Sequence, residues 1–109
     1  MSDSQSQLYR IEFYVPQDHL AEVKSALFAA GAGRIGNYDC CSWETKGLGQ
    51  FRPLAGSNPV IGQHEKLEYL DEFKVEMVCE KANLKAAVEA MISAHPYEQP
   101  AYAVIAMQA

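Results

Sequence analysis

The sequence predicts one α+β domain, in which an antiparallel sheet carries two helices on one face. Two stretches alternate apolar and polar residues, which is the period of a half-buried strand. Each stretch is followed by apolar residues at helical spacing. The 109 residues fit one domain, and 49% hydrophobic with 21% charged residues are ordinary values for a globular protein.

The N-terminal half is predicted as strand, helix and strand. Leu8–Val15 alternates, so we expect a half-buried strand there. Pro16 ends this strand, and its fixed φ suits the start of a helix that ends at Gly31. The apolar face of the helix is Leu20, Val23, Leu27 and Phe28. A second strand is expected around Asn37–Thr45, because its aromatic residues favour extended backbone.

The middle of the chain is predicted to be rich in loops. Phe51–Leu54 is interpreted as a short return strand that Pro53 confines to an edge. Residues Ala55–Gly62 are mainly Gly, Ser, Asn and Pro, which is typical of an excursion over the surface. We therefore expect an extra loop or hairpin between the second and third core strands.

The C-terminal half repeats the order strand, helix, strand. Phe73–Cys79 alternates against charged residues and is predicted as a strand. Asn83 is expected to cap a helix, and the residues His95–Pro100 end it, because the residue before a proline avoids helical geometry. The apolar face of this helix is Leu84, Ala87, Val88, Met91 and Ile92. Ala101–Met107 is predicted as the last strand.

The order of elements matches the split βαβ, or ferredoxin-like, plan. Residues 1–7 are expected to be a disordered tail, and residues 8–109 a single domain. With helices on one face only, the other face must be polar or covered, and self-association is the simplest cover. The candidates for uncovered apolar surface are Tyr14, Trp43, Val78, Tyr102 and Val104.

Charge and cysteine content limit the class of protein. Nine Lys and Arg against 14 Asp and Glu give a net charge of −5, which argues against nucleic-acid binding. No apolar run approaches the ~20 residues that span a bilayer, and the N-terminus lacks the pattern of a secretory signal. The three cysteines lack a paired framework, so we expect reduced thiols and a cytoplasmic location.

Three separated motifs carry a resemblance to a known family. They are GAGRIGNYDCCS at residues 31–42, GQFRPL at 49–54 with SNPVIG at 57–62, and AHPYEQPAY at 94–102. With these motifs the chain resembles the Nif-three-like family, and more narrowly the insert domain of YqfO-type members as a free-standing protein. The resemblance covers nearly the whole chain, from Leu8 to Met107.

The resemblance implies a fold similar to CutA and PII signalling proteins, and with it a homotrimer. Full-length relatives carry a two-metal site on lobes that flank this insert, and no segment here corresponds to them. We therefore do not expect the hydrolase-like chemistry of these relatives in this chain. The sequence also lacks G-x-S-x-G, P-loop and H-E-x-x-H motifs, which favours a non-catalytic protein.

Two groups of residues are candidate metal ligands. His95 and Glu98 stand three apart around a proline, so that imidazole and carboxylate could converge on a proton or a divalent metal. Alternatively, His95 caps the preceding helix. Cys40 and Cys41 could bind copper(I) or another soft ion, or simply be buried apolar residues. No cofactor beyond such a metal or copper ion is expected.

Other candidates lie in the glycine-containing motifs. Arg34 and Arg52 could hold a carboxylate or phosphate, or could pair with Asp39 and Glu44. Trp43 is interpreted as an interface residue. The predicted ligand-binding set is Arg34, Asn37, Tyr38, Arg52, Asn58, His95, Tyr97 and Glu98, and the predicted metal set is His95, Glu98, Cys40 and Cys41.

Three functions are carried forward from these residues. The first is an oligomeric binding or regulatory module, with clefts between subunits formed by the three loop motifs. The second is a divalent-metal or copper-binding protein that uses His95, Glu98 and a cysteine of a neighbouring subunit. The third is an enzyme with acid/base catalysis by His95 and Glu98. The ligand itself is not predicted.

Overall fold

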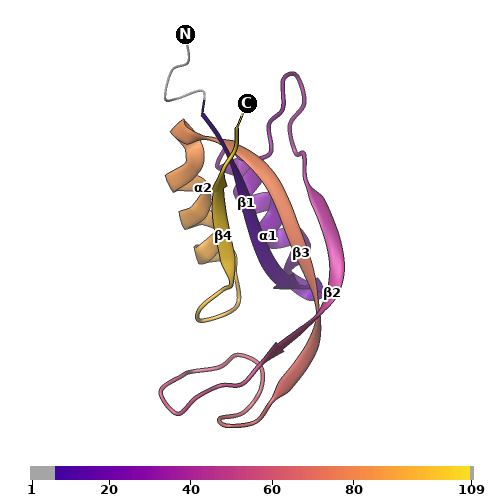
Figure 1. The fold of residues 1–109 in the computed structure, drawn as a ribbon, viewed down its shortest axis with the longest axis vertical. Coiled ribbons are helices and arrows are strands. Elements are labelled where there is room, and N and C mark those ends of the chain that lie inside the picture. Colours follow the sequence, from indigo (N-terminus) through magenta and orange to yellow (C-terminus); the bar gives the residue numbers. More distant parts are fainter. Residues whose placement is uncertain (1–6, 109) are drawn as a thin grey trace.

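The computed structural model describes residues 7–108 and forms the predicted α+β fold. The elements are β1 (Leu8–Pro16), α1 (Gln17–Ala29), β2 (Trp43–Phe51), β3 (Glu68–Glu80), α2 (Lys81–Ala94) and β4 (Tyr102–Ala106). The strands form one sheet in the order β2-β3-β1-β4, and every pair is antiparallel. Both helices lie behind the sheet in Figure 1, on one face. The ferredoxin-like prediction is confirmed.

The predicted N-terminal tail lies mostly outside the described residues, since residues 1–6 are not described. Gln7 is held at the end of the sheet where β1 begins, next to the C-terminal ends of β3 and β4. Its side-chain amide donates to the carbonyl of Met107 at 2.8 Å, and its own carbonyl accepts from the backbone N–H of Lys81 at 3.0 Å. Gln7 is therefore part of the ordered domain.

The core lies between the sheet and the two helices. β1 supplies Ile11, Phe13 and Val15, each fully buried, as its alternation predicted. Opposite them, β3 supplies Val75 and Met77. The other buried apolar residues are Val23, Leu27, Ala32, Cys79, Ala87 and Met91. Burial of these side chains is the main favourable term in folding.

Helix α1 ends in a Schellman motif. Gly31 has φ +102, the N–H of Ala32 donates to the Leu27 carbonyl at 3.0 Å, and the N–H of Gly31 donates to the Phe28 carbonyl at 3.0 Å. The predicted cap at Asn83 is wrong, because α2 begins two residues earlier and its N-cap residue is Glu80. Asn83 instead lies against Gly31, where an added Cβ would come within 2.8 Å of its Nδ2.

The second strand is shifted along the chain from its predicted position. We expected Asn37–Thr45, whereas β2 spans Trp43–Phe51. Ile35 and Tyr38 pair across a tight turn, and Cys40 has φ +54, which is incompatible with extended backbone. The segment 31–42 is therefore a short loop before the strand.

The middle of the chain also departs from its prediction. Phe51–Leu54 is not a return strand, because Phe51 ends β2 and the next three residues are irregular. β3 begins at Glu68, five residues before the expected start at Phe73. β2 and β3 thus form a long hairpin that stretches the molecule to 52 × 23 × 22 Å (Figure 1).

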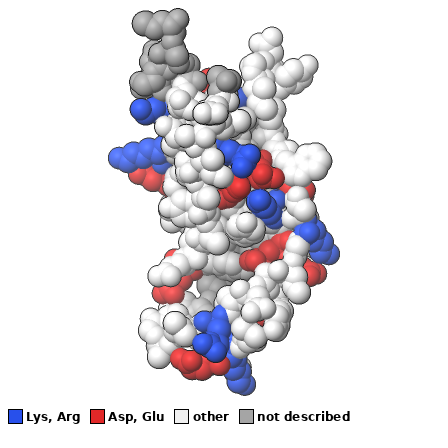
Figure 2. All heavy atoms as spheres, in the orientation of Figure 1, with Lys and Arg blue, Asp and Glu red and all other residues white. Residues whose placement is uncertain are grey.

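The face of the sheet that turns away from the helices carries a band of charge, visible as blue and red side chains across the strands in Figure 2. Glu12 lies there with Arg10 at 3.7 Å and Lys74 at 3.6 Å, and Arg10 also reaches Glu76 at 3.7 Å. The same face presents three of the five residues predicted for it: Tyr14, Trp43 and Val78. Tyr102 and Val104 are exposed apolar residues, as predicted, but they lie on the other face, because they pair with residues of β1 whose side chains face the helices. No helix of the described residues is long and apolar enough to cross a membrane.

Candidate functional site

A cavity of ≈ 270 Å³ lies where two irregular segments meet the end of the sheet. One segment is the excursion, residues 52–67, between β2 and β3. The other is the turn, residues 95–101, between α2 and β4. Figure 1 shows the turn next to the excursion at the lower end of the sheet. The lining residues are Tyr14, Gln50, Phe51, Pro53, Ser57, Pro59, Val60, Ile61, Glu72, Tyr97, Glu98, Gln99 and Ala101.

His95 fixes the start of the turn. It is only 6% exposed, its Nε2 lies 2.6 Å from the Tyr14 carbonyl, and its Nδ1 accepts the backbone N–H of Tyr97 at 3.1 Å. Because Nδ1 is an acceptor, Nε2 carries the proton and donates to the carbonyl, so the ring is neutral. Burial lowers the pKa of His95 below 6.5, although the bond to Tyr14 and the nearby Glu72 act in the opposite direction.

Tyr97 forms the inner wall of the cavity. Its hydroxyl donates to Oε2 of Glu72 at 2.9 Å, and this bond joins the turn to β3. Its ring lies 4.8 Å from the ring of His95 and 6.5 Å from that of Phe51. Burial, and then the hydrogen bond to Glu72, raise the pKa of Tyr97 well above its ordinary value. The phenol is thus held protonated, as a donor.

The excursion is fastened both to itself and to the turn. The backbone N–H and the hydroxyl of Ser57 both donate to the Leu54 carbonyl, at 3.0 and 2.7 Å, and Nε2 of His64 lies 2.8 Å from the Ser57 carbonyl. The backbone N–H of Asn58 donates to Oε1 of Glu98 at 3.0 Å, across 40 residues of sequence. These contacts give the cavity a defined outer wall.

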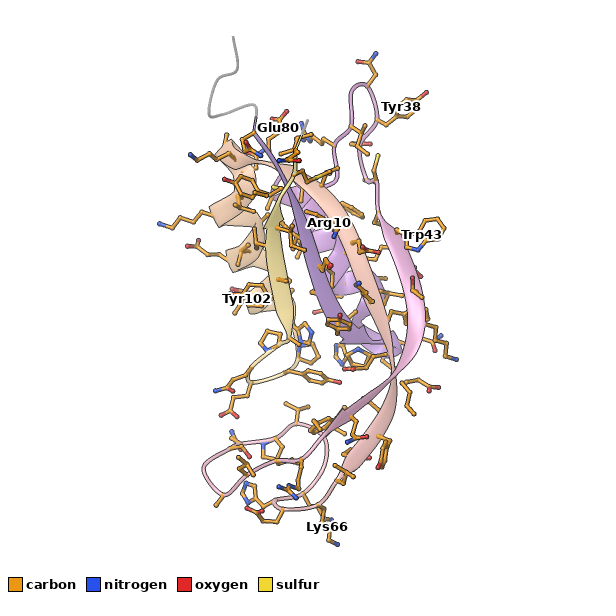
Figure 3. The ribbon with its side chains drawn as sticks, in the orientation of Figure 1. Arg10, Tyr38, Trp43, Lys66, Glu80 and Tyr102 are labelled. Atoms are coloured by element: carbon orange, nitrogen blue, oxygen red, sulfur yellow. The ribbon has the colours of Figure 1, made fainter. Side chains whose placement is uncertain are left out.

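The structure brings together four of the predicted ligand-binding residues: Asn58, His95, Tyr97 and Glu98. The other predicted residues lie elsewhere. Arg34, Asn37, Tyr38, Cys40 and Cys41 belong to the loop 31–42, which is at the opposite end of the molecule (Figures 1 and 3, where Tyr38 is labelled). Arg52 follows β2 and is exposed, but it does not line the cavity.

The predicted metal ligands do not converge within one chain. Among residues 7–108, no group of three His, Cys, Asp or Glu side chains is placed to hold a metal ion. Both ring nitrogens of His95 are engaged with backbone groups, so binding a metal there would break a hydrogen bond. Cys40 is exposed, and Sγ of Cys41 lies 3.5 Å from the Asp39 carbonyl. A metal site shared between subunits stays a prediction.

The predicted ligand-binding set lacks the four lining residues that come from strands, Tyr14, Gln50, Phe51 and Glu72. Glu72 lies on the same face as Tyr14, because it pairs with Pro16 in the register of β1 with β3. The alternation within β3 indicates on which face of the sheet Glu72 lies. Only the register of the strands shows at which end of the sheet it lies.

Comparison with known proteins gives relatives in sequence and in structure. The chain is 45% identical over 95 residues to a protein of Halalkalibacterium halodurans named GTP cyclohydrolase 1 type 2 homolog, covering 87% of this chain and 26% of that protein. It is 43% identical over 95 residues to the Bacillus subtilis protein of the same name, with the same coverage of 87% and 26%. No family model matches the chain.

Two solved structures place the fold. A Bacillus cereus protein related to NIF3 superposes with a TM-score of 0.82 at 34% identity, over 95% of this chain and 26% of that one. The periplasmic divalent cation tolerance protein CutA of Archaeoglobus fulgidus superposes with a TM-score of 0.67 at 13% identity, over 94% of this chain and 85% of that one. The second match shows the fold alone. This chain therefore spans about a quarter of the length of its sequence relatives and nearly all of the CutA fold.

Proposed function

The chain is homologous to one segment of NIF3-related proteins, and from this premise we propose that it is a non-catalytic, self-associating binding or regulatory module. The activity in the relatives' name belongs to proteins more than three times as long, so the proposal takes only what this one segment can do by itself. We further propose that the assembly is a homotrimer, as the resemblance to CutA-like and PII-like proteins implies.

The observation that carries the proposal is the face of the sheet opposite the helices. Trp43 stands on it 69% exposed and Tyr14 39% exposed, beside the cluster of Arg10, Glu12 and Lys74. Exposed aromatic residues are typical of the centre of a protein interface, and charged residues are typical of its polar rim. The two edge strands, β2 and β4, also leave backbone groups free to pair with another chain.

A non-catalytic role is supported by the state of His95. Histidine is the residue type best suited to proton transfer near neutral pH, but both ring nitrogens of His95 hold the turn to Tyr14 and Tyr97. A general base must reach a proton of the substrate, whereas this ring is only 6% exposed. The geometry favours His95 as a support for the cavity wall.

The test is the mass of the native protein and of two matched variants of β2. Trp43→Glu puts a charge on the proposed interface, whereas Leu48→Glu changes an equally exposed residue, 70% exposed, on the other face of the same strand. Native mass spectrometry should give a trimer for the parent and for Leu48→Glu, and a monomer for Trp43→Glu. A monomeric parent, or a variant pair that behaves alike, would contradict self-association through this face.

A further inference from the structure

The cavity between the excursion and the turn combines an apolar wall with two carboxylates. Of its 13 lining residues, Glu72 and Glu98 are acidic, and none is Lys or Arg. We propose that this cavity binds a small organic amine: a free molecule with one protonated nitrogen and an apolar body. The inference deepens the proposed binding role by naming its ligand, and it does not require self-association.

The carboxylates are positioned without being neutralised. Tyr97 donates to Oε2 of Glu72, and Asn58 donates to Oε1 of Glu98, so each carboxylate is held through one oxygen. Neither glutamate takes part in an ion pair of the described residues, although six such pairs form elsewhere among them. Two oriented carboxylates facing one cavity favour a cation there. They repel phosphate and carboxylate ligands, because no positive side chain lines the walls.

The walls select the apolar part of the ligand. Tyr14, Phe51 and Tyr97 bring three aromatic rings to the cavity, and aromatic faces attract a cation as well as covering apolar surface. The remaining wall of the excursion is apolar, formed mainly by Pro53, Pro59, Val60 and Ile61. The volume of ≈ 270 Å³ is about nine times the ≈ 30 Å³ share of one water molecule, which suits an amine with a single aromatic ring.

Two glycines of β2 allow the carboxylate of Glu72 to be displaced without being replaced, one as the test and the other as its control. Gly49 lies directly beneath the side chain of Glu72, so that a Cβ at this position would overlap Oε1 and the carboxylate carbon. Gly47 stands two residues away on the same face, and a Cβ there would meet nothing within 4 Å. Gly49→Ala therefore displaces Glu72, and Gly47→Ala is its matched control.

The experiment uses three probes of nearly equal shape and different charge. They are 2-phenylethylamine, 2-phenylethanol and 3-phenylpropionate, each titrated into the full chain and followed by ¹H–¹⁵N NMR. We expect the amine to shift the amide signals of Asn58, Tyr97 and Glu98, and to bind at least about tenfold more tightly than the alcohol, since it gains a charge-assisted hydrogen bond. The carboxylate probe should leave the spectrum unchanged.

The variants locate the binding. Glu72→Gln and Gly49→Ala should each weaken the amine about tenfold or more, and Gly47→Ala should bind it as the parent does. The dispersion of the NMR spectrum shows that each variant is folded. Equal binding of the alcohol and the amine, unchanged affinity in Glu72→Gln, or no shift at these three amides would overturn the proposal.

Two further readouts separate this proposal from others. Nα-acetyl-lysine methylamide presents the same ammonium on a peptide, and binding of this probe as tight as that of 2-phenylethylamine would overturn the choice of a free amine. Native masses recorded on the same samples report self-association. A monomer that still binds the amine would contradict the trimer and leave the amine site standing.

Discussion

His95 shows how a single residue can hold a whole turn. Its ring is buried and accepts the Tyr97 N–H through Nδ1, so that protonation would replace an acceptor by a donor and place a charge away from water. Glu72 is the carboxylate that favours the charged ring, and His19 opposes it, but burial dominates and the pKa is lowered. The neutral form is therefore the form that the fold requires.

The stability of the protein should fall in acid because of this histidine. A histidine whose pKa is lower in the folded state than in the unfolded state contributes stability above the unfolded pKa of 6.5, and this stability is lost as pH falls below 6.5 towards the folded value. We expect the urea midpoint to drop between about pH 7.5 and about pH 5.

The pH dependence can be assigned to His95 by two substitutions. His95→Gln keeps a donor but cannot titrate, so the fall in urea midpoint should shrink, at the cost of about 1–3 kcal/mol of stability at neutral pH from imperfect hydrogen bonds. His64→Gln, at an exposed histidine of the excursion, is the control substitution, and the difference between the two variants is the part of the acid response that belongs to His95. An unchanged acid response in His95→Gln would place the titrating group elsewhere.

At the scale of elements, the end of α1 depends on one glycine. Gly31 adopts a left-handed conformation and also leaves room for Asn83 of α2, so the same position ends one helix and sets its distance from the other. Gly31→Ala should cost at least about 1–2 kcal/mol in the free energy of unfolding, because the backbone is strained and Asn83 must move. Chemical denaturation measures this loss.

Gly56→Ala is a suitable control for that measurement. Gly56 lies in the excursion with nothing within 4 Å of an added Cβ, and its φ is not in the left-handed region. The substitution should change stability by less than about 0.5 kcal/mol. If both variants were equally stable, the Schellman motif would not be a determinant of the fold.

Elements with a clear period were predictable from the sequence, and those controlled by local turns were not. The alternation of β1 and β3 and the apolar stripes of both helices predicted the topology, because each pattern reflects burial on one face. The predicted position of β2 was wrong because Gly36 and Cys40 adopt positive φ and end the extended backbone there. A cysteine gives no sequence signal for such a conformation. Asn83 looked like a cap because a polar residue before an apolar stripe is the usual cap pattern, whereas α2 begins directly from β3.

At the scale of the whole molecule, half of the predicted ligand-binding set was brought together. The resemblance of the motifs to the Nif-three-like family is confirmed by the relatives, but a motif does not state which end of the sheet it occupies. Asn58 and Glu98 meet across 40 residues, whereas Arg34 and Cys40 belong to a loop beyond the far end of β2. Only the tertiary fold determines which of the predicted ligand-binding residues lie together.

Self-association through the face of the sheet opposite the helices predicts a midpoint of thermal unfolding that depends on protein concentration. When folded chains are stabilised by binding one another, dilution lowers the midpoint by mass action. In differential scanning calorimetry, the midpoint of the parent and of Leu48→Glu should rise as the protein concentration increases from about 5 to about 500 μM. Trp43→Glu should unfold at one temperature throughout, and a parent midpoint independent of concentration would argue against an assembly.

The position of β4 has a consequence for biosynthesis. The last strand pairs with the first, Tyr9 opposite Ala106, and the cavity uses residues from Tyr14 to Ala101. A ribosome releases β1 long before β4 has been synthesised, so the edge of β1 that pairs with β4 stays open until the chain has been made as far as Ala106. The cavity is complete only after Ala101 has been synthesised, so a chain that stops before the turn lacks the binding site.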